Sequence, residues 1–412
     1  MYTLLTQNRN FRFYLIGGGI SKLGDILSGL AFLFLAHDMT RSGVHTTGMA
    51  IAETLPYLFF GLVGGVIADW LPRKRLLICL DGIRFPLILS VVFLDSTGSL
   101  TYLYLLFVSF LIQTIGCFFN PAHRAILPMI THKDERTAAN SLQDSITRGI
   151  TVLSPLITVS LIKTLGVVHF FTIDAVTYLI SILCLLRVFV QETKKDCSKS
   201  VRQLFSTILS FFVWARQHVT VRQLFLFTFI TVFLNTWVWE VGLLLGLAEL
   251  TSNEQSIYSI LQGVFGAVVI VTNLILPYFI KKMTLKTYLV GAAIWGIGIT
   301  YYGALFDVKH FYIGCAIVGI GLPIAGLARV YLLQSLIPEE KLGRAFSFNA
   351  VLLYLANTVS LALFGTLSAY VPIRLLMTGS GVVILLTSIT FLLIKTVGCS
   401  ELRRGRPVNF FK

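Results

Sequence analysis

Two long apolar runs, at about residues 48–68 and 76–94, are joined by the stretch Gly64-Gly65-Val66-Ile67-Ala68-Asp69-Trp70-Leu71-Pro72-Arg73-Lys74-Arg75. An apolar run of about 20 residues is long enough to cross a bilayer as a helix. Because the connection is so short, the two helices must form an antiparallel hairpin. The three consecutive bases after Pro72 are typical of a cytoplasmic loop. The stretch therefore predicts a protein of membrane-spanning helices.

The same stretch carries a face of small residues and one carboxylate. Gly61, Gly64 and Gly65 leave the first helix without bulk on one side, so that another helix can approach closely. Asp69 falls at the membrane edge, where a lone carboxylate is costly unless a base pairs with it. We therefore expect a gating or charge network that includes Gly65, Asp69, Arg73 and Lys74.

The composition supports a polytopic membrane protein. Of the 412 residues, 56% are hydrophobic and 13% are charged, whereas soluble domains carry about 25% charged residues. The net charge of +14 could suggest a nucleic-acid partner, but the bases recur in alternate loops between apolar runs, as the positive-inside rule predicts, and do not form one basic surface. The six cysteines have no metal or redox spacing, so we expect no metal and no cofactor.

Twelve spans are predicted, and their even number places both termini on the same side of the membrane. Bases near both ends, among them Arg12 and Arg403, place that side in the cytoplasm. The spans lie near residues 12–36, 47–68, 75–94, 100–119, 138–163, 167–189, 222–247, 256–279, 286–306, 310–335, 345–369 and 372–395.

The two halves of the chain resemble each other. Residues 122–142 and 328–348 both end one helix, turn through a charged loop and start another helix with Ala and Ser. A polar stretch near the middle contains basic and apolar residues typical of a helix at the membrane surface. We therefore predict an N-terminal six-helix bundle at 1–190, a cytoplasmic linker with a surface helix at 191–221, and a C-terminal six-helix bundle with a short basic tail at 222–412.

These features resemble the major facilitator superfamily. Its loop between helices 2 and 3 has the pattern Gly-x-x-x-Asp-Arg-x-Gly-Arg-Arg, which Gly65, Asp69, Arg73 and Lys74 match, whereas Trp70 and Pro72 depart from it. Further residues resemble the drug:proton antiporter subgroup that contains macrolide-efflux and enterobactin-export proteins. They are Ser21, Gly24, Asp25, Asp81, Arg84, Gln334, Gly343, Arg344 and the segments 118–122, 126–128 and 138–142. The fifth helix reads Ser154-Pro155 where that subgroup often has Gly-Pro.

The resemblance implies an all-α fold of two pseudo-symmetric six-helix bundles in a bacterial cytoplasmic (inner) membrane. It also implies that the loop containing Asp69 is a conformational latch, and that helices 1, 4, 7 and 10 line a central cavity. This arrangement favours Asp25, Gln113, Glu240 and Arg329 as cavity residues.

Ionisable residues inside a span are functional candidates. Lys22 and Asp25 lie three residues apart on the first helix, so Asp25 either binds a proton or a cationic substrate, or forms a structural pair with Lys22. Glu53 is suited to proton uptake, because desolvation favours the neutral form, or it reaches the outer surface. Glu240, beside two tryptophans, either contacts a cationic aromatic substrate or lies at the membrane interface.

Other charged residues have partners within reach on their own helix. Asp81 and Arg84 are expected to join Asp69 and Arg73 in a cytoplasmic gating network. The spacing of Asp144 and Arg148 allows an ion pair, whereas Arg329 needs a carboxylate from another helix or an anionic substrate. Asp174, on the sixth span, is interpreted as structural.

The expected function is secondary transport, because no phosphate-binding loop that would hold ATP appears. The leading hypothesis is proton-coupled efflux of an amphipathic small molecule such as a drug, antibiotic or siderophore, by a monomer that interacts with protons and the lipid bilayer. Uptake by symport and lipid flipping by the same fold remain open. A membrane-embedded enzyme or sensor is the alternative of another class, suggested by the spacing of His169 and Asp174.

Overall fold

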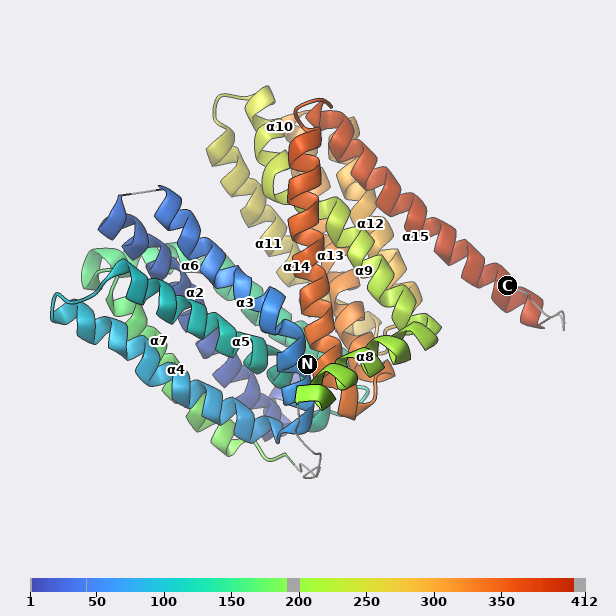
Figure 1. Ribbon diagram of the computed structural model, residues 1–412. Helices are drawn as coiled ribbons and strands as arrows, with labels where there is room; N and C mark the ends of the chain where they lie inside the picture. Colours follow the sequence, from blue (N-terminus) through green and yellow to red (C-terminus); the bar gives the residue numbers. More distant parts are fainter. Residues whose placement is uncertain (1, 42, 191–200, 404–412) are drawn as a thin grey trace. The chain divides into compact units, whose positions relative to one another are not determined.

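The computed structural model describes residues 2–41, 43–190 and 201–403, and these ranges contain helices and no strand (Figure 1). The helices are α1 (Tyr2–Gln7), α2 (Arg9–Thr40), α3 (Gly43–Trp70), α4 (Arg73–Ser96), α5 (Tyr102–Ile130), α6 (Arg136–Leu165), α7 (His169–Arg187), α8 (Val201–Gln217), α9 (Val219–Trp237), α10 (Leu243–Leu250), α11 (Glu254–Phe279), α12 (Leu285–Ala304), α13 (Val308–Leu336), α14 (Leu342–Leu367) and α15 (Ile373–Arg403). A π-helical turn, Val238–Gly242, joins α9 to α10, and a 3-10 turn, Glu339–Lys341, precedes α14.

Each of the twelve predicted spans falls on a helix, and the seventh covers α9, the π turn and α10 together. Among the described residues, ten helical segments are long and apolar enough to cross a membrane. The other two predicted spans fall on α6 and α12, which have 30 and 20 residues. Both are long enough to span a bilayer, and glycines and tyrosines on α12 lower its mean hydropathy.

The chain forms two compact units. Unit 1 contains the described residues up to Arg222 together with Leu333–Tyr354, and unit 2 contains Gln223–Leu332 and the described residues from Leu355 onward. The first turns of α14 therefore pack with the N-terminal helices, whereas the rest of α14 packs with unit 2. The sequence analysis places the boundaries of the two six-helix bundles at residues 190 and 221, and these boundaries remain a prediction.

Unit 1 is built around the close contact of α2 with α7 and of α3 with α5, and α4 packs against both α5 and α7. Glycines allow α2 to approach α7. A Cβ at Gly17 would meet Cys184, and a Cβ at Gly24 would overlap the side chains of Asp174 and Thr177. Two apolar clusters fill the unit, one around Phe11 and Leu127 and another around Phe32 and Phe171.

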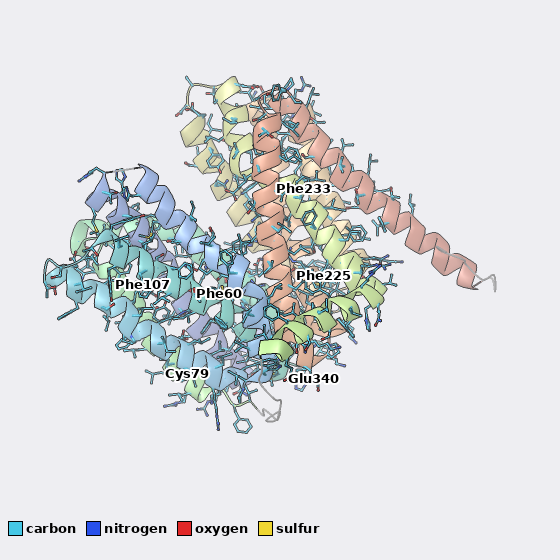
Figure 2. The ribbon with its side chains drawn as sticks, viewed as in Figure 1. Phe60, Cys79, Phe107, Phe225, Phe233 and Glu340 are labelled. Carbon is cyan, nitrogen blue, oxygen red and sulfur yellow. The ribbon has the colours of Figure 1, made fainter. Side chains whose placement is uncertain are left out.

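In unit 2, α12 packs closely against α15 (Figure 1). Small residues again allow the approach, because a Cβ at Gly296 would meet the backbone of Leu385 at 2.8 Å. Many large apolar side chains on both units are exposed, as expected where helices face lipid. Phe107 of α5 is one of them, 55% exposed (Figure 2).

Candidate functional site

The stretch that decides the fold supplies a carboxylate that caps another helix. Asp69, the penultimate residue of α3, has a side chain that is 2% exposed. Its carboxylate accepts hydrogen bonds from the backbone N–H groups of Gly343 (2.7 Å) and Arg344 (3.1 Å), and from Nε of Arg344 (2.9 Å). These N–H groups belong to the first turn of α14, where a helix leaves its donors unsatisfied and where an anion is favoured. Asp69 thus caps α14 from a different helix.

Arg73, the first residue of α4, connects three segments of unit 1. It is 6% exposed and lies 3.4 Å from Asp69. It also donates to the carbonyl oxygens of Ala125 at 3.2 Å and Glu339 at 2.5 Å. The next residue, Lys74, donates to the carbonyl oxygen of Leu186. The bases of this loop therefore satisfy backbone carbonyls at the ends of α5 and α7 and in the turn before α14.

The small-residue face of α3 contacts two helices. A Cβ at Gly64 would overlap the carbonyl oxygen of Cys117 on α5. A Cβ at Gly65 would come within 2.6 Å of the carbonyl oxygen of Gly343 on α14. The close approach expected at these glycines is present, and it brings the backbone of α14 near enough for Asp69 to cap it.

A second polar cluster lies inside unit 1, on α2, α4 and α7. Asp25 is half-buried and accepts a hydrogen bond from the Tyr178 hydroxyl at 3.0 Å. Asp81 is fully buried, accepts from Ser181 at 2.7 Å and lies 3.6 Å from Arg84. We call the set Asp25, Asp81, Arg84, Asp174, Tyr178 and Ser181 the interior cluster.

Arg84 joins the members of the interior cluster. Its guanidinium lies 5.5 Å from the ring centre of Tyr178 and 4.8 Å from that of Phe119 on α5, both within the range of cation–π attraction. The side chain is only 4% exposed, and its Nε makes no hydrogen bond among the described residues. A buried cation held largely by aromatic faces and by one carboxylate at 3.6 Å is sensitive to the charge of its neighbours.

The two acidic residues expected to share a gating network have different partners. Asp69 contacts Arg73, Gly343 and Arg344, whereas Asp81 contacts Arg84 and Ser181. These two sets share no member. Asp81 and Arg84 therefore lie with Asp25 in the interior cluster, and their gating role remains a prediction.

The remaining candidates are dispersed. Lys22 and Gln113 are half-buried on α2 and α5. Glu53 has one buried carboxylate oxygen that makes no hydrogen bond among the described residues. The ion pair predicted between Asp144 and Arg148 is present on α6 at 2.7 Å, with both side chains about one third exposed.

Two candidates belong to unit 2. Glu240 is exposed on the π turn, in electrostatic contact with Tyr258 of α11. Arg329 is half-buried on α13 near Tyr288 of α12.

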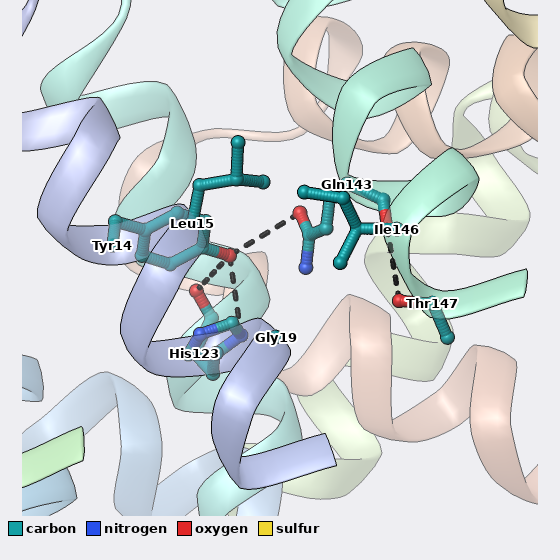
Figure 3. A pocket seen from close by; sticks show the side chains of 8 residues that line it. Tyr14, Leu15, Gly19, His123, Gln143, Ile146 and Thr147 are labelled. Carbon is teal, nitrogen blue, oxygen red and sulfur yellow. Dashed lines mark hydrogen bonds between the residues drawn. The ribbon is translucent and has the colours of Figure 1, made fainter. Parts of the chain in front are cut away.

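The sequence analysis missed a small polar pocket between α2, α5 and α6 (Figure 3). The Tyr14 hydroxyl lies 3.1 Å from Nδ1 of His123 and 3.3 Å from Oε1 of Gln143, and the rings of Tyr14 and His123 stack at 4.3 Å. The cavity of about 20 Å³ is large enough for about one water molecule. His123 lies in one of the internally repeated segments, and that position was its only signal in the sequence.

A second missed contact joins α6 to the end of α13 within unit 1. The side-chain amides of Asn140 and Gln334 exchange hydrogen bonds at 2.7 and 3.3 Å. Arg136 donates to the Gln334 carbonyl oxygen at 2.9 Å. Gln334 was singled out only as a motif position, because nothing in the sequence identifies a partner 194 residues away.

In the part of the chain that the structure describes, no group of three His, Cys, Asp or Glu side chains could hold a metal ion. His169 is exposed, whereas Asp174 is fully buried against α2, so the two do not form one catalytic surface.

Comparison with known proteins identifies a family and several relatives of this chain. A family model described as transmembrane secretion effector matches residues 4–404. The uncharacterised MFS-type transporter YkuC of Bacillus subtilis is 27% identical over 176 residues, 42% of this chain and 40% of YkuC. The proposed bacilysin exporter BacE of Bacillus amyloliquefaciens is 28% identical over 212 residues, 48% of this chain and 49% of BacE. The matched region thus spans less than half of each of these relatives.

Solved structures share the fold at low sequence identity. A bacterial homologue of the iron transporter ferroportin has a TM-score of 0.73 at 16% identity, with 94% of this chain and 99% of that chain covered. The E. coli fucose:proton symporter FucP has a TM-score of 0.73 at 13% identity, with 93% and 99% covered. The helices, their packing and the family match together show that the chain is a multi-pass membrane protein and that it belongs to the transmembrane secretion effector family of the major facilitator superfamily, whose members are transporters and not enzymes.

Proposed function

We propose that the protein exports an amphipathic small molecule in exchange for protons. The observation that carries the proposal is Asp25, a half-buried carboxylate on the first membrane-spanning helix that accepts a hydrogen bond from Tyr178. An ionisable residue held inside a span is a functional candidate, because its charge is costly there. The family description and the exporter name of BacE support the outward direction and an antibiotic-like substrate.

In this mechanism the substrate and the proton use the charge of Asp25 alternately. A proton arriving at Asp25 neutralises the carboxylate and so weakens its attraction for a cationic or polar group of the substrate. Loss of that proton toward the cytoplasm restores the charge and the site. The proposal also includes a bacterial inner-membrane location with both termini in the cytoplasm, and function as a monomer.

Asp25→Asn is expected to slow proton-driven export at least about tenfold, or about 1.4 kcal/mol in the rate-limiting barrier. The amide keeps the shape and can still meet Tyr178, but it cannot bind and release the proton. Accumulation of ethidium or bacilysin in inverted membrane vesicles with an imposed pH gradient would measure the effect. Asp144→Asn is the matched control, because that carboxylate is one third exposed and already paired with Arg148.

Export by the Asp25→Asn variant at the wild-type rate would remove Asp25 from the mechanism. Wild-type transport that ignores the pH gradient, or that runs only toward the cytoplasm in intact cells, would instead favour facilitated transport or uptake. Movement of a fluorescent phospholipid between leaflets, with no movement of either small probe, would favour lipid flipping.

A further inference from the structure

Asp174 is a carboxylate that is completely enclosed by unit 1. It is 0% exposed on α7. The backbone of α2 presses directly on it, because a Cβ at Gly24 would overlap its Oδ1. Asp25, the residue after Gly24, is close enough to Asp174 to interact with it electrostatically. Asp174 therefore lies beside the proposed proton-binding residue, although its position on the sixth span suggested a structural role.

The interior cluster contains more acids than bases. It has three carboxylates, Asp25, Asp81 and Asp174. Within one helical turn of any of them, α2, α4 and α7 carry two bases, Lys22 and Arg84. Even if both bases are counted, one carboxylate remains without a matching positive charge. An unmatched charge in a membrane interior is unfavourable, so the cluster must hold at least one proton to be neutral.

The hydrogen bonds indicate which carboxylate holds that proton. Asp81 has Ser181 as a donor and Arg84 as a counter-charge, and Asp25 has the Tyr178 hydroxyl as a donor. Among the described residues no base forms an ion pair with Asp174, the Thr177 hydroxyl reaches its Oδ1 only at 3.2 Å, and its Oδ2 accepts no hydrogen bond.

Each hydroxyl group next to Asp174 shares its one proton with a backbone carbonyl oxygen. Thr177 donates to the backbone carbonyl oxygen of Asp174 at 2.7 Å, a shorter contact than the 3.2 Å to Oδ1. Ser28, which also lies beside the carboxyl group, donates to the backbone carbonyl oxygen of Asp25 at 3.3 Å. A hydroxyl has one proton and two lone pairs. Each hydroxyl group therefore gives Asp174 at most a shared hydrogen bond, which compensates a carboxylate less than the donor and counter-charge of Asp81 do.

Other groups facing the cluster do not change this balance. Tyr57 of α3 and Cys117 of α5 are neutral in their ordinary forms, and they approach Arg84. Ser21 of α2 lies between Gly17 and Gly24 on the face that packs against α7; its hydroxyl is 3% exposed and makes no hydrogen bond among the described residues. A hydroxyl in this place can relay a proton without a change of charge, because it can accept one proton while it releases its own.

We propose that Asp174 holds the exchangeable proton of the transporter in this conformation, and that Asp25 is the carboxylate with which it exchanges. The step is a proton transfer alone. The O–H bond of the Asp174 carboxyl group breaks, an O–H bond forms on Asp25, and the total charge of the cluster is unchanged. This inference rests on the proposed proton coupling, because without it the proton on Asp174 would be only structural.

The experiment measures the protonated carboxyl group directly. Infrared spectra of the purified full-length protein in lipid nanodiscs would be recorded across a pH series near neutrality. We expect wild type to show the carbonyl stretch of a protonated carboxylic acid in a dry environment. Asp174→Asn should lose that band by one carboxyl equivalent, Asp174→Glu should shift its frequency, and Asp144→Asn should leave it unchanged.

Three outcomes overturn the inference. They are the absence of the band from wild type, which needs no variant to fold, its persistence at full intensity in Asp174→Asn, and its failure to shift in Asp174→Glu. The vesicle assay separates this result from the proposed function. If wild-type export depends on the pH gradient but the band does not depend on Asp174, only the assignment of Asp174 fails. If wild-type export ignores the gradient, the proton coupling itself fails, whatever the spectra show.

Discussion

Asp69→Asn is expected to lower the free energy of unfolding by about 3–5 kcal/mol, the usual cost of removing one partner from a buried ion pair. Three hydrogen bonds from Gly343 and Arg344 meet on this carboxylate, and Arg73 lies 3.4 Å away. The amide has the same shape, but it carries no charge to balance Arg344 and Arg73, whose side chains are 13% and 8% exposed. The NH₂ group of the asparagine would also face the N–H groups of Gly343 and Arg344, with which it cannot form a hydrogen bond because both sides are donors.

Chemical unfolding of the purified protein in detergent would measure this change, with Asp38→Asn as the control. Asp38 also pairs with an arginine, Arg41 at the C-terminal end of α2 at 3.7 Å, but the two side chains are 56% and 76% exposed. An exposed pair contributes about 0–1 kcal/mol. Equal losses for the two variants would mean that the carboxylate of Asp69 does not hold α14, and that the shape of its side chain is sufficient.

Gly64→Ala is expected to destabilise the protein by about 3 kcal/mol, near the upper end for overpacking. The added methyl group would overlap the carbonyl oxygen of Cys117, and a backbone atom cannot move aside as a flexible side chain can. The helices α3 and α5 would have to separate along their whole contact. That separation would also move Asp69, which lies further along α3, away from the first turn of α14.

Gly82→Ala is the matched control, because Gly82 is exposed on α4 and a Cβ there would meet nothing within 4 Å. Alanine in an open helical position is more favourable than glycine by about 0.5–1 kcal/mol. The two substitutions add the same atoms, so opposite signs are expected in the same unfolding assay. A neutral or stabilising result at Gly64 would show that α3 and α5 are not held at this close distance.

The helical architecture could be predicted because hydrophobic length and the placement of bases are local properties of the chain. The stretch from Gly64 to Arg75 contains both the close-packing glycines and the carboxylate that caps a helix. Its partners lie 274 and 275 residues away, at Gly343 and Arg344. These two residues were recognised as motif positions, but no spacing rule connects them with Asp69. Contacts of such separation are decided by tertiary packing.

The interior cluster was predictable only in part. Asp25, Asp81 and Arg84 were identified because charges inside a span are conspicuous. Tyr178 was not, because a tyrosine in an apolar helix is ordinary until its hydroxyl meets a carboxylate. Asp174 was interpreted as structural from its helix number, whereas its surroundings depend on Gly24, a residue that matters through the side chain it lacks.

The π turn between α9 and α10 lets residues on both sides of it pack into the same apolar cluster. Trp237 just before the turn, Val238 at its start, and Leu243 and Leu247 after it are all buried in the same cluster. Val238 and Leu243 are five residues apart, a separation that a regular helix would place about 140° apart around its axis. The π turn contains one residue more than a regular helical turn, as the hydrogen bond from Leu243 N–H to the Val238 carbonyl oxygen shows. This extra residue brings the side chains of Val238 and Leu243 back toward the same side of the helix. Deleting one residue here would leave the helix intact but would turn the leucines of α10 away from their neighbours.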